Sequence, residues 1–96
     1  MNEGKIKYIA NHYGIKHQSK KIIEEMGELI TALCKLDEYP ACDKKIKQRY
    51  DEVVEEIADV IIMTEQIKYL YGSSQIEEVI EKKLDRQILR IKTGVD

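Results

Sequence analysis

Apolar residues recur at intervals of three and four along four stretches of the chain, a pattern typical of amphipathic helices. The first helix is predicted at about residues 2–11, ahead of Gly14, which favours a left-handed stop. The second is predicted from about His17 to Leu36, ending before Pro40, because the residue preceding a proline is disfavoured in the α conformation.

The third predicted helix is the longest; it begins near Asp43, an expected N-cap, and runs to Gly72. The fourth opens on Ser74-x-x-Glu77, the pattern of a capping box. No segment alternates with period two for long enough to predict a strand. We therefore expect an all-α fold, a helical bundle of about four helices in one domain spanning residues 1–96.

The composition bounds the size of the core and the kinds of partner. A chain of 96 residues with 43% hydrophobic residues buries only somewhat more than ~60% of its unfolded surface, so we expect a thin core and self-association. The net charge of −2 gives no basic field, so a nucleic acid polymer is not an expected partner.

The expected cellular location is inferred from targeting and membrane-spanning patterns that the sequence lacks. No stretch approaches the ~20 apolar residues of a membrane span, and the N-terminus does not resemble a signal peptide, so we expect no membrane association and a cytoplasmic location. Cys34 and Cys42 lack the spacing of a redox or zinc motif and are expected to be unpaired thiols.

Two acidic motifs stand out on the predicted helices: Glu24-Glu25-x-x-Glu28 and Glu56-x-x-Asp59. These spacings place the carboxylates of each motif on a limited arc of its helix. Like charges four residues apart cost an isolated helix roughly 0.2–0.5 kcal/mol per pair. The motifs therefore indicate that a cation compensates the charge.

The first motif by itself is compatible with a solvated helix surface. The apolar arc of the second predicted helix is centred near Met26 and Leu33. Glu24 and Glu28 then lie on the opposite side, and Glu25 lies at the edge of the arc.

The second motif is more informative, because Glu56 falls within the apolar arc of the third predicted helix, between Val53 and Met63. A carboxylate in such surroundings must be paired, protonated or bound to a metal, since burying a bare charge is very costly. Asp59 lies one turn further on, at the edge of that arc. A salt bridge to a lysine or arginine is the alternative to a metal.

The type of ligand selects the type of metal. Carboxylates without histidine or cysteine at ligand spacing favour a hard cation, Mg²⁺ or Mn²⁺. A di-iron bundle would need Glu-x-x-His, and neither His12 nor His17 has a glutamate three residues before it.

A hard cation held by few carboxylates keeps open positions that bind phosphate oxygens, and a phosphate site also needs basic side chains. The fourth predicted helix carries Lys83, Arg86 and Arg90 at spacings of three and four, and Lys20 and Lys21 precede the first acidic motif. Ordinary surface ion pairs are the alternative for each of these residues.

Together these motifs resemble a known family. The run KIIEEMGELITALCK followed by EEIADVIIMTEQI is similar to the EExxE…ExxD signature of the MazG-like, all-α nucleoside triphosphate pyrophosphohydrolases. Flanking segments HQSKKIIEE and KKLDRQILRI extend the resemblance over most of the chain.

The resemblance implies Mg²⁺-dependent hydrolysis of a nucleoside triphosphate to the monophosphate and pyrophosphate, often to remove non-standard nucleotides, by a homodimer or homotetramer. It implies that Glu24, Glu25, Glu28 and Asp59 bind metal and that Glu56 binds metal or orients water. Either Glu25 or Glu28 would be the general base. A set of basic residues would contact the phosphates: Lys21, Lys83 and Arg86.

Nucleobase recognition is not determined by these motifs. His17, Gln18 and Tyr13 precede the first acidic motif and could contact a base or ribose, or could pack at the start of the helix. Two other functions fit the same pattern: a phosphoribosyl-ATP pyrophosphohydrolase, and a non-catalytic helical assembly or regulatory module.

Overall fold

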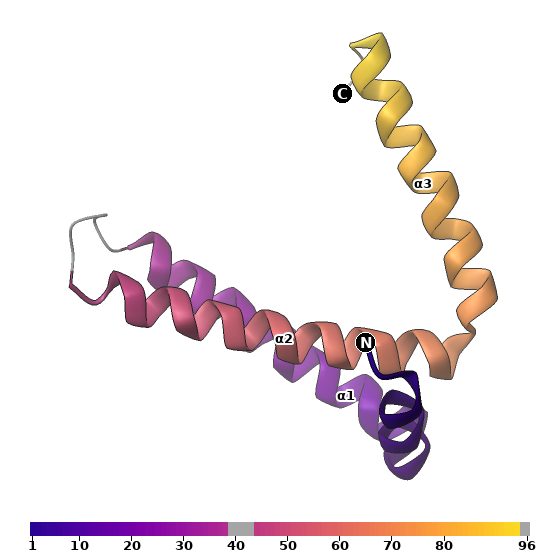
Figure 1. Cartoon of the computed structure of the whole chain (residues 1–96), viewed down its shortest axis with the longest axis horizontal. Helices are drawn as coiled ribbons and strands as arrows, with labels where there is room; N and C mark the ends of the chain where they lie inside the picture. Colours follow the sequence, from indigo (N-terminus) through magenta and orange to yellow (C-terminus); the bar gives the residue numbers. More distant parts are fainter. Residues whose placement is uncertain (39–43, 95–96) are drawn as a thin grey trace.

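Three α-helices make up the described part of the chain, residues 1–38 and 44–94, in a computed structural model (Figure 1). They are α1 (Glu3–Asp37), α2 (Ile46–Tyr71) and α3 (Ser73–Thr93). The described residues contain no strand, so the expected all-α fold is confirmed.

The first two predicted helices form the single element α1, which bends at Gly14. There the backbone adopts φ 82° and ψ 168°, a conformation that residues with a Cβ rarely adopt, whereas glycine does so without steric cost. The Asn2 side chain caps the start of α1 by accepting a hydrogen bond from the Lys5 backbone N–H at 3.0 Å. Gly14 is therefore a non-helical kink at which two helical segments join, at the glycine where the sequence predicts the first helix to stop.

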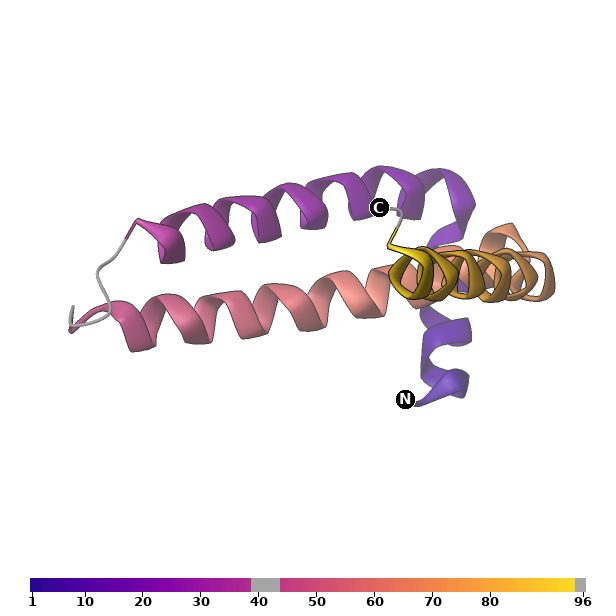
Figure 2. The same ribbon diagram turned by 90° about the horizontal axis from the view of Figure 1, so that it is seen from above.

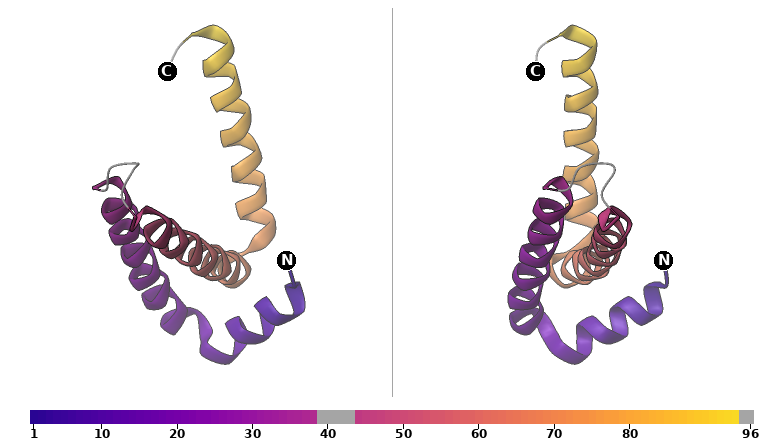
Figure 3. Two further views of the ribbon diagram at one scale, coloured as in Figure 1. Left: turned by 60° about the vertical axis from the view of Figure 1, so that its left-hand side comes forward. Right: turned by 90° about the vertical axis from the view of Figure 1, so that its left-hand side faces the viewer.

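The long segments of α1 and α2 lie side by side and antiparallel, as Figure 2 shows. The part of α1 before Gly14 turns across the C-terminal end of α2 (Figure 3), where Asn11 accepts a hydrogen bond of 3.1 Å from the Tyr69 hydroxyl. The predicted N-cap Asp43 and the predicted stop at Pro40 lie outside the described residues, as does Cys42; Cys34 is exposed on α1.

Helix α3 follows α2 after one residue, Gly72, whose φ of 124° makes the sharp turn possible. The predicted capping box is wrong. Because α3 already begins at Ser73, Ser74 lies inside the helix and makes no capping bond, and Glu77 pairs instead with Lys68 of α2. The turn directs α3 away from the α1–α2 pair (Figure 1).

The core is thin, as the length predicts. Among the described residues its buried members are five apolar residues and two glutamines: Ile6, Ala10, Ala32, Val53, Met63, Gln18 and Gln66. The radius of gyration is 17.0 Å, whereas a compact domain of this length has a radius of about 12–13 Å.

Much apolar surface is left uncovered on this open structure. The predicted apolar arc around Met26 and Leu33 does not face α2, and Ile30 within it is 62% exposed. The most apolar arc of this part of α1 is therefore largely uncovered within one chain. Instead α1 turns a narrower strip toward α2, the strip that contains Gln18, Glu25 and Ala32.

Candidate metal centre

The two acidic motifs meet between α1 and α2. One carboxylate oxygen each from Glu25, Glu56 and Asp59 lies within 4.8 Å of the other two. Glu25 comes from α1, and the other two come from neighbouring turns of α2. We call these three residues the acidic cluster. Residues far apart along the chain thus become neighbours because the two helices pack antiparallel.

Two oxygens of the acidic cluster are buried and unsatisfied. Glu25 Oε2 and Glu56 Oε2 are inaccessible to solvent and accept no hydrogen bond from the described residues. Within residues 1–38 and 44–94, neither Glu56 nor Asp59 forms an ion pair, so the salt bridge considered for Glu56 is not formed there. A buried acceptor without a partner costs about 1–3 kcal/mol, which a bound cation would recover.

Lys21 approaches the cluster from one side only. Its Nζ lies 3.5 Å from Glu25 Oε1 and 3.6 Å from Glu24 Oε2. One oxygen of Glu25 is thereby partly neutralised, while the other, Oε2, is buried and has no hydrogen-bond partner among the described residues. Burial raises the pKa of Glu25, the negative charges of Glu28 and Asp59 raise it further, and Lys21 opposes them.

A groove adjoins the cluster through Glu56, which belongs to both. Its volume is about 510 Å³. Besides Glu56 it is lined by seven residues of α1 and α2: Glu24, Gly27, Glu28, Thr31, Ala32, Lys35 and Glu52. Four of the eight lining residues are glutamates, and Lys35 is the one basic residue among them.

The residues predicted to bind metal therefore divide into two groups. Glu25, Glu56 and Asp59 converge, whereas Glu24 and Glu28 are exposed and line the groove. The donor set is entirely carboxylate oxygen, which suits a hard cation. At Mg–O distances of 2.0–2.1 Å two ligand oxygens are at most about 4.2 Å apart, so small side-chain movements would close the cluster around such an ion.

The predicted phosphate-binding residues are not brought together within one chain. Lys21 lies beside the acidic cluster, but Lys83 and Arg86 are exposed on α3. Across the described residues, α3 contacts α2 and not α1.

The structure also locates the residues considered for nucleobase contact. His17 stacks on Tyr13 with ring centroids 4.7 Å apart, and its Nδ1 is hydrogen-bonded to Gln18. The Gln18 amide is buried and bonds to Gln66, as the packing alternative would require. Our motif search missed Gln66, although its spacing of seven residues from Asp59, matching that of Gln18 from Glu25, was a detectable signal.

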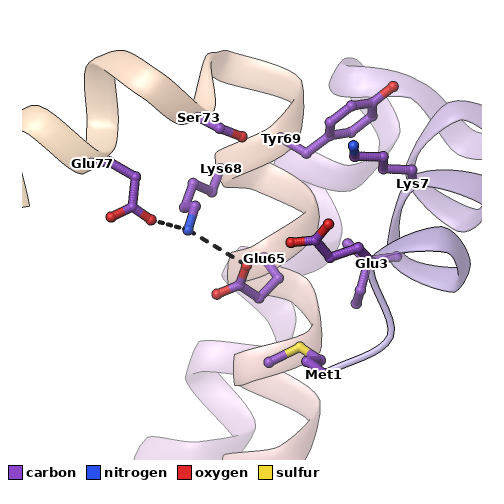
Figure 4. Close-up of a pocket in the computed structure, with 9 residues that line it drawn as sticks. Met1, Glu3, Lys7, Glu65, Lys68, Tyr69, Ser73 and Glu77 are labelled. Carbon is purple, nitrogen blue, oxygen red and sulfur yellow. Dashed lines mark hydrogen bonds and ion pairs between the residues drawn. The ribbon is translucent and has the colours of Figure 1, made fainter.

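A second cavity of about 300 Å³ lies where the start of α1, the end of α2 and the start of α3 meet (Figure 4). Three of its charged groups form ion pairs, since Lys68 pairs with Glu77 and lies 3.7 Å from Glu65. The Lys7 ammonium lies 5.6 Å from the centre of the Tyr69 ring, close enough for a cation–π contact. Unlike the acidic cluster, this cavity already has its counter-charges.

None of the described helices has the length and hydropathy needed to cross a membrane. Comparison of the chain with protein-family models, curated proteins and solved structures found no match. The resemblance to the MazG-like enzymes thus depends on the acidic motifs and their flanking segments.

Proposed function

We propose that this protein is a MazG-like, divalent-cation-dependent nucleoside triphosphate pyrophosphohydrolase that works on the nucleotide pool of the cytoplasm. The observation that carries the proposal is the convergence of Glu25, Glu56 and Asp59, two of which have a buried oxygen without a partner. A site with this excess of negative charge is stabilised by a cation and is poorly suited to bind an anion directly.

In this proposal the acidic cluster holds Mg²⁺ or Mn²⁺. A bound divalent ion would neutralise triphosphate oxygens and position the reacting phosphorus. Lys21, whose Nζ lies 3.5 Å from Glu25 Oε1, would help to orient the Glu25 carboxylate, whose other oxygen is buried. Its ammonium is also a candidate for contact with a phosphate oxygen.

The groove would receive the nucleotide next to the cluster. Glu28 lines it as an exposed carboxylate, so Glu28 can accept the proton of an attacking water more readily than the largely buried Glu25. Water adds to the inner phosphorus, the bond to the bridging oxygen breaks, and pyrophosphate leaves with that electron pair. Glu56, shared by groove and cluster, would bind metal or orient this water.

The proposed enzyme is a homodimer or homotetramer. Many large apolar side chains on α1, α2 and α3 are exposed, and contiguous exposed apolar surface favours association between chains. Because α3 projects from the α1–α2 pair, Lys83 and Arg86 would reach phosphates bound to a neighbouring subunit, completing a bundle that one chain leaves open. The exposed residues of the α3 stripe are Val79, Ile80, Leu84, Ile88 and Ile91.

The test is pyrophosphate release from a panel of standard and modified nucleoside triphosphates with Mg²⁺. We expect turnover of at least one substrate by the wild type and its loss in Glu56→Gln. Glu55→Gln is the matched control, because Glu55 is an exposed neighbour on α2 outside the cluster. No turnover across the panel, or full activity of Glu56→Gln, would defeat the proposal. Including phosphoribosyl-ATP in the panel separates the related pyrophosphohydrolase, which would act on that substrate alone.

A non-catalytic assembly module is the second candidate, and the uncovered stripe of α3 favours it. Calorimetric titration with Mn²⁺ and then with a nucleotide discriminates between the two. The module should bind neither, whereas the enzyme should bind Mn²⁺ through the acidic cluster.

A further inference from the structure

Two glutamines lie at the centre of the α1–α2 interface. Gln18 is 3% exposed and Gln66 is 2% exposed, and the Gln18 Nε2 donates a hydrogen bond of 2.6 Å to Gln66 Oε1. We call them the amide pair. Buried amides are costly unless their hydrogen bonds are made, so each glutamine depends on the other.

The amide pair belongs to a directional chain of hydrogen bonds. His17 Nδ1 lies 2.7 Å from Gln18 Oε1, and because an amide oxygen only accepts, the imidazole is the donor. At the other end, Gln66 Nε2 donates to the Met63 sulfur at 3.9 Å. All four polar side-chain atoms of the amide pair thus make a hydrogen bond in this arrangement.

The same number of residues separates the amide pair from the acidic cluster on α1 and on α2. Gln18 precedes Glu25 by seven residues on α1, and Gln66 follows Asp59 by seven residues on the antiparallel α2. Seven residues are about two turns, or roughly 10.5 Å. The register that joins the amides is therefore also the register that places Glu25 opposite Asp59.

Other contacts between the long segments specify this register weakly. The buried apolar members there are Ala32, Val53 and Met63, and hydrophobic contact is non-directional. The exposed hydrogen bond of 2.9 Å between Ser19 and Tyr71 competes with water. A slide of one turn, about 5.4 Å, would exchange one apolar contact for another but would leave both buried amides without partners.

We propose that the Gln18–Gln66 amide pair sets the register of α1 against α2 and so positions the carboxylates of the acidic cluster. The glutamines are positioning residues and contact neither metal nor substrate. The register part stands on the interface alone, and the metal-positioning part rests on the proposed function.

The test replaces the amide pair with apolar residues that keep the interface filled, in Gln18→Leu/Gln66→Leu. One spin label is attached to native Cys34 of α1 and the other to Glu55→Cys of α2, in a Cys42→Ser background. Pulsed electron paramagnetic resonance then measures the distance between the labels, which depends on the register. Dilution with unlabelled chain ensures that the distance is measured within one chain. We expect one narrow distance for the wild-type interface. The double-leucine variant should show a broadened distribution, or a second distance displaced by about one turn, 5.4 Å.

Mn²⁺ titration of the same proteins adds the functional readout. The double-leucine variant should bind Mn²⁺ about tenfold or more weakly, as expected when groups supporting a metal site are lost, while resisting urea as well as the wild type. Gln18→Met/Gln66→Met, which changes the shape of the interface least, is the second variant. Ser19→Ala/Tyr71→Phe is the control that removes an exposed cross-helix bond and should change neither distance nor affinity.

An unchanged narrow distance in both double variants would overturn the register assignment. Failure of both to fold would also overturn it, because the amides would then supply stability and not register. If the wild-type protein shows one register but does not bind Mn²⁺, the register assignment holds and the proposed function is contradicted.

Discussion

Two polar layers occupy the same helix–helix interface, about two turns apart, and they differ in how their polar atoms are satisfied. In the amide pair each of the four polar side-chain atoms makes a hydrogen bond, and the chain of bonds runs from His17 to Met63 within the protein. In the acidic cluster Glu25 Oε2 and Glu56 Oε2 have no partner among the described residues, and three carboxylates share the space.

The contrast separates a structural polar layer from a candidate binding site. Both layers cost free energy to bury, but only the amide pair recovers that cost from its own hydrogen bonds. The acidic cluster needs something from outside the chain. Burial of polar groups therefore does not identify a site by itself, whereas a buried acceptor lacking a donor does so much better.

Breaking the amide pair from one side should have the largest effect on stability. Gln66→Ala leaves Gln18 without its acceptor and opens a cavity, so we expect the free energy of unfolding to fall by about 3 kcal/mol. Urea denaturation measures this. In the double-leucine variant, where no buried amide remains, the loss should be much smaller; equal losses would show that the hydrogen bond is not what matters.

Removing one carboxylate from the acidic cluster should reduce its unsatisfied charge, the property that distinguishes it from the amide pair. A ligand at one hundred times its dissociation constant stabilises the folded state by about 2.7 kcal/mol, and Glu56→Ala should lose this Mn²⁺-dependent gain. Without metal the variant should be at least as stable as the wild type, because it removes an unsatisfied acceptor and like-charge repulsion. Thermal unfolding with and without Mn²⁺ checks both expectations. Strong destabilisation without metal would indicate a structural role for Glu56.

The pH dependence sharpens the comparison further. Because burial raises the pKa of Glu25, the folded protein binds that proton more tightly than the unfolded chain does. Without metal, the stability contributed by this proton is fully present below the unfolded pKa and is lost as pH rises through the raised folded pKa. In Glu25→Gln this part of the pH dependence should disappear, and stability at neutral pH should rise by about 1 kcal/mol. Urea denaturation at a series of pH values from about 4, near the ordinary carboxyl pKa, to about 8 measures it.

The smallest effect is expected outside both layers. Lys68→Met removes the ion pairs with Glu77 and Glu65 at the turn between α2 and α3. These groups are partly exposed, so the free energy of unfolding should change by only about 0.5 kcal/mol. Mn²⁺ affinity should stay at the wild-type value. A large loss of affinity would show that the orientation of α3 influences the acidic cluster.

Individual motifs predicted some parts of this structure and not others. Helical spacing located the long helices, and the apolar neighbours of Glu56 correctly indicated a carboxylate turned toward the interface. The capping box at Ser74 was wrong, because a one-residue connection moved the helix start and gave Glu77 another partner. The apolar arc of α1 was identified correctly as a pattern, but it does not face α2.

Helical periodicity, glycine positions and the acidic spacings are local properties, so the sequence alone was enough to predict the all-α class. It also gave five candidate metal ligands: Glu24, Glu25, Glu28, Glu56 and Asp59. Only the packing of α1 on α2 shows that Glu25, Glu56 and Asp59 are the three that converge. Which strip of α1 faces α2 is a different matter, because it depends on the rotation and sliding of one helix against another. In the folded chain the strip of α1 that contains Ala32 and the polar layers faces α2, and the more apolar arc does not. The partnership of Gln18 with Gln66, and the absence of a partner for Glu56 Oε2 among the described residues, emerge only once that packing is set.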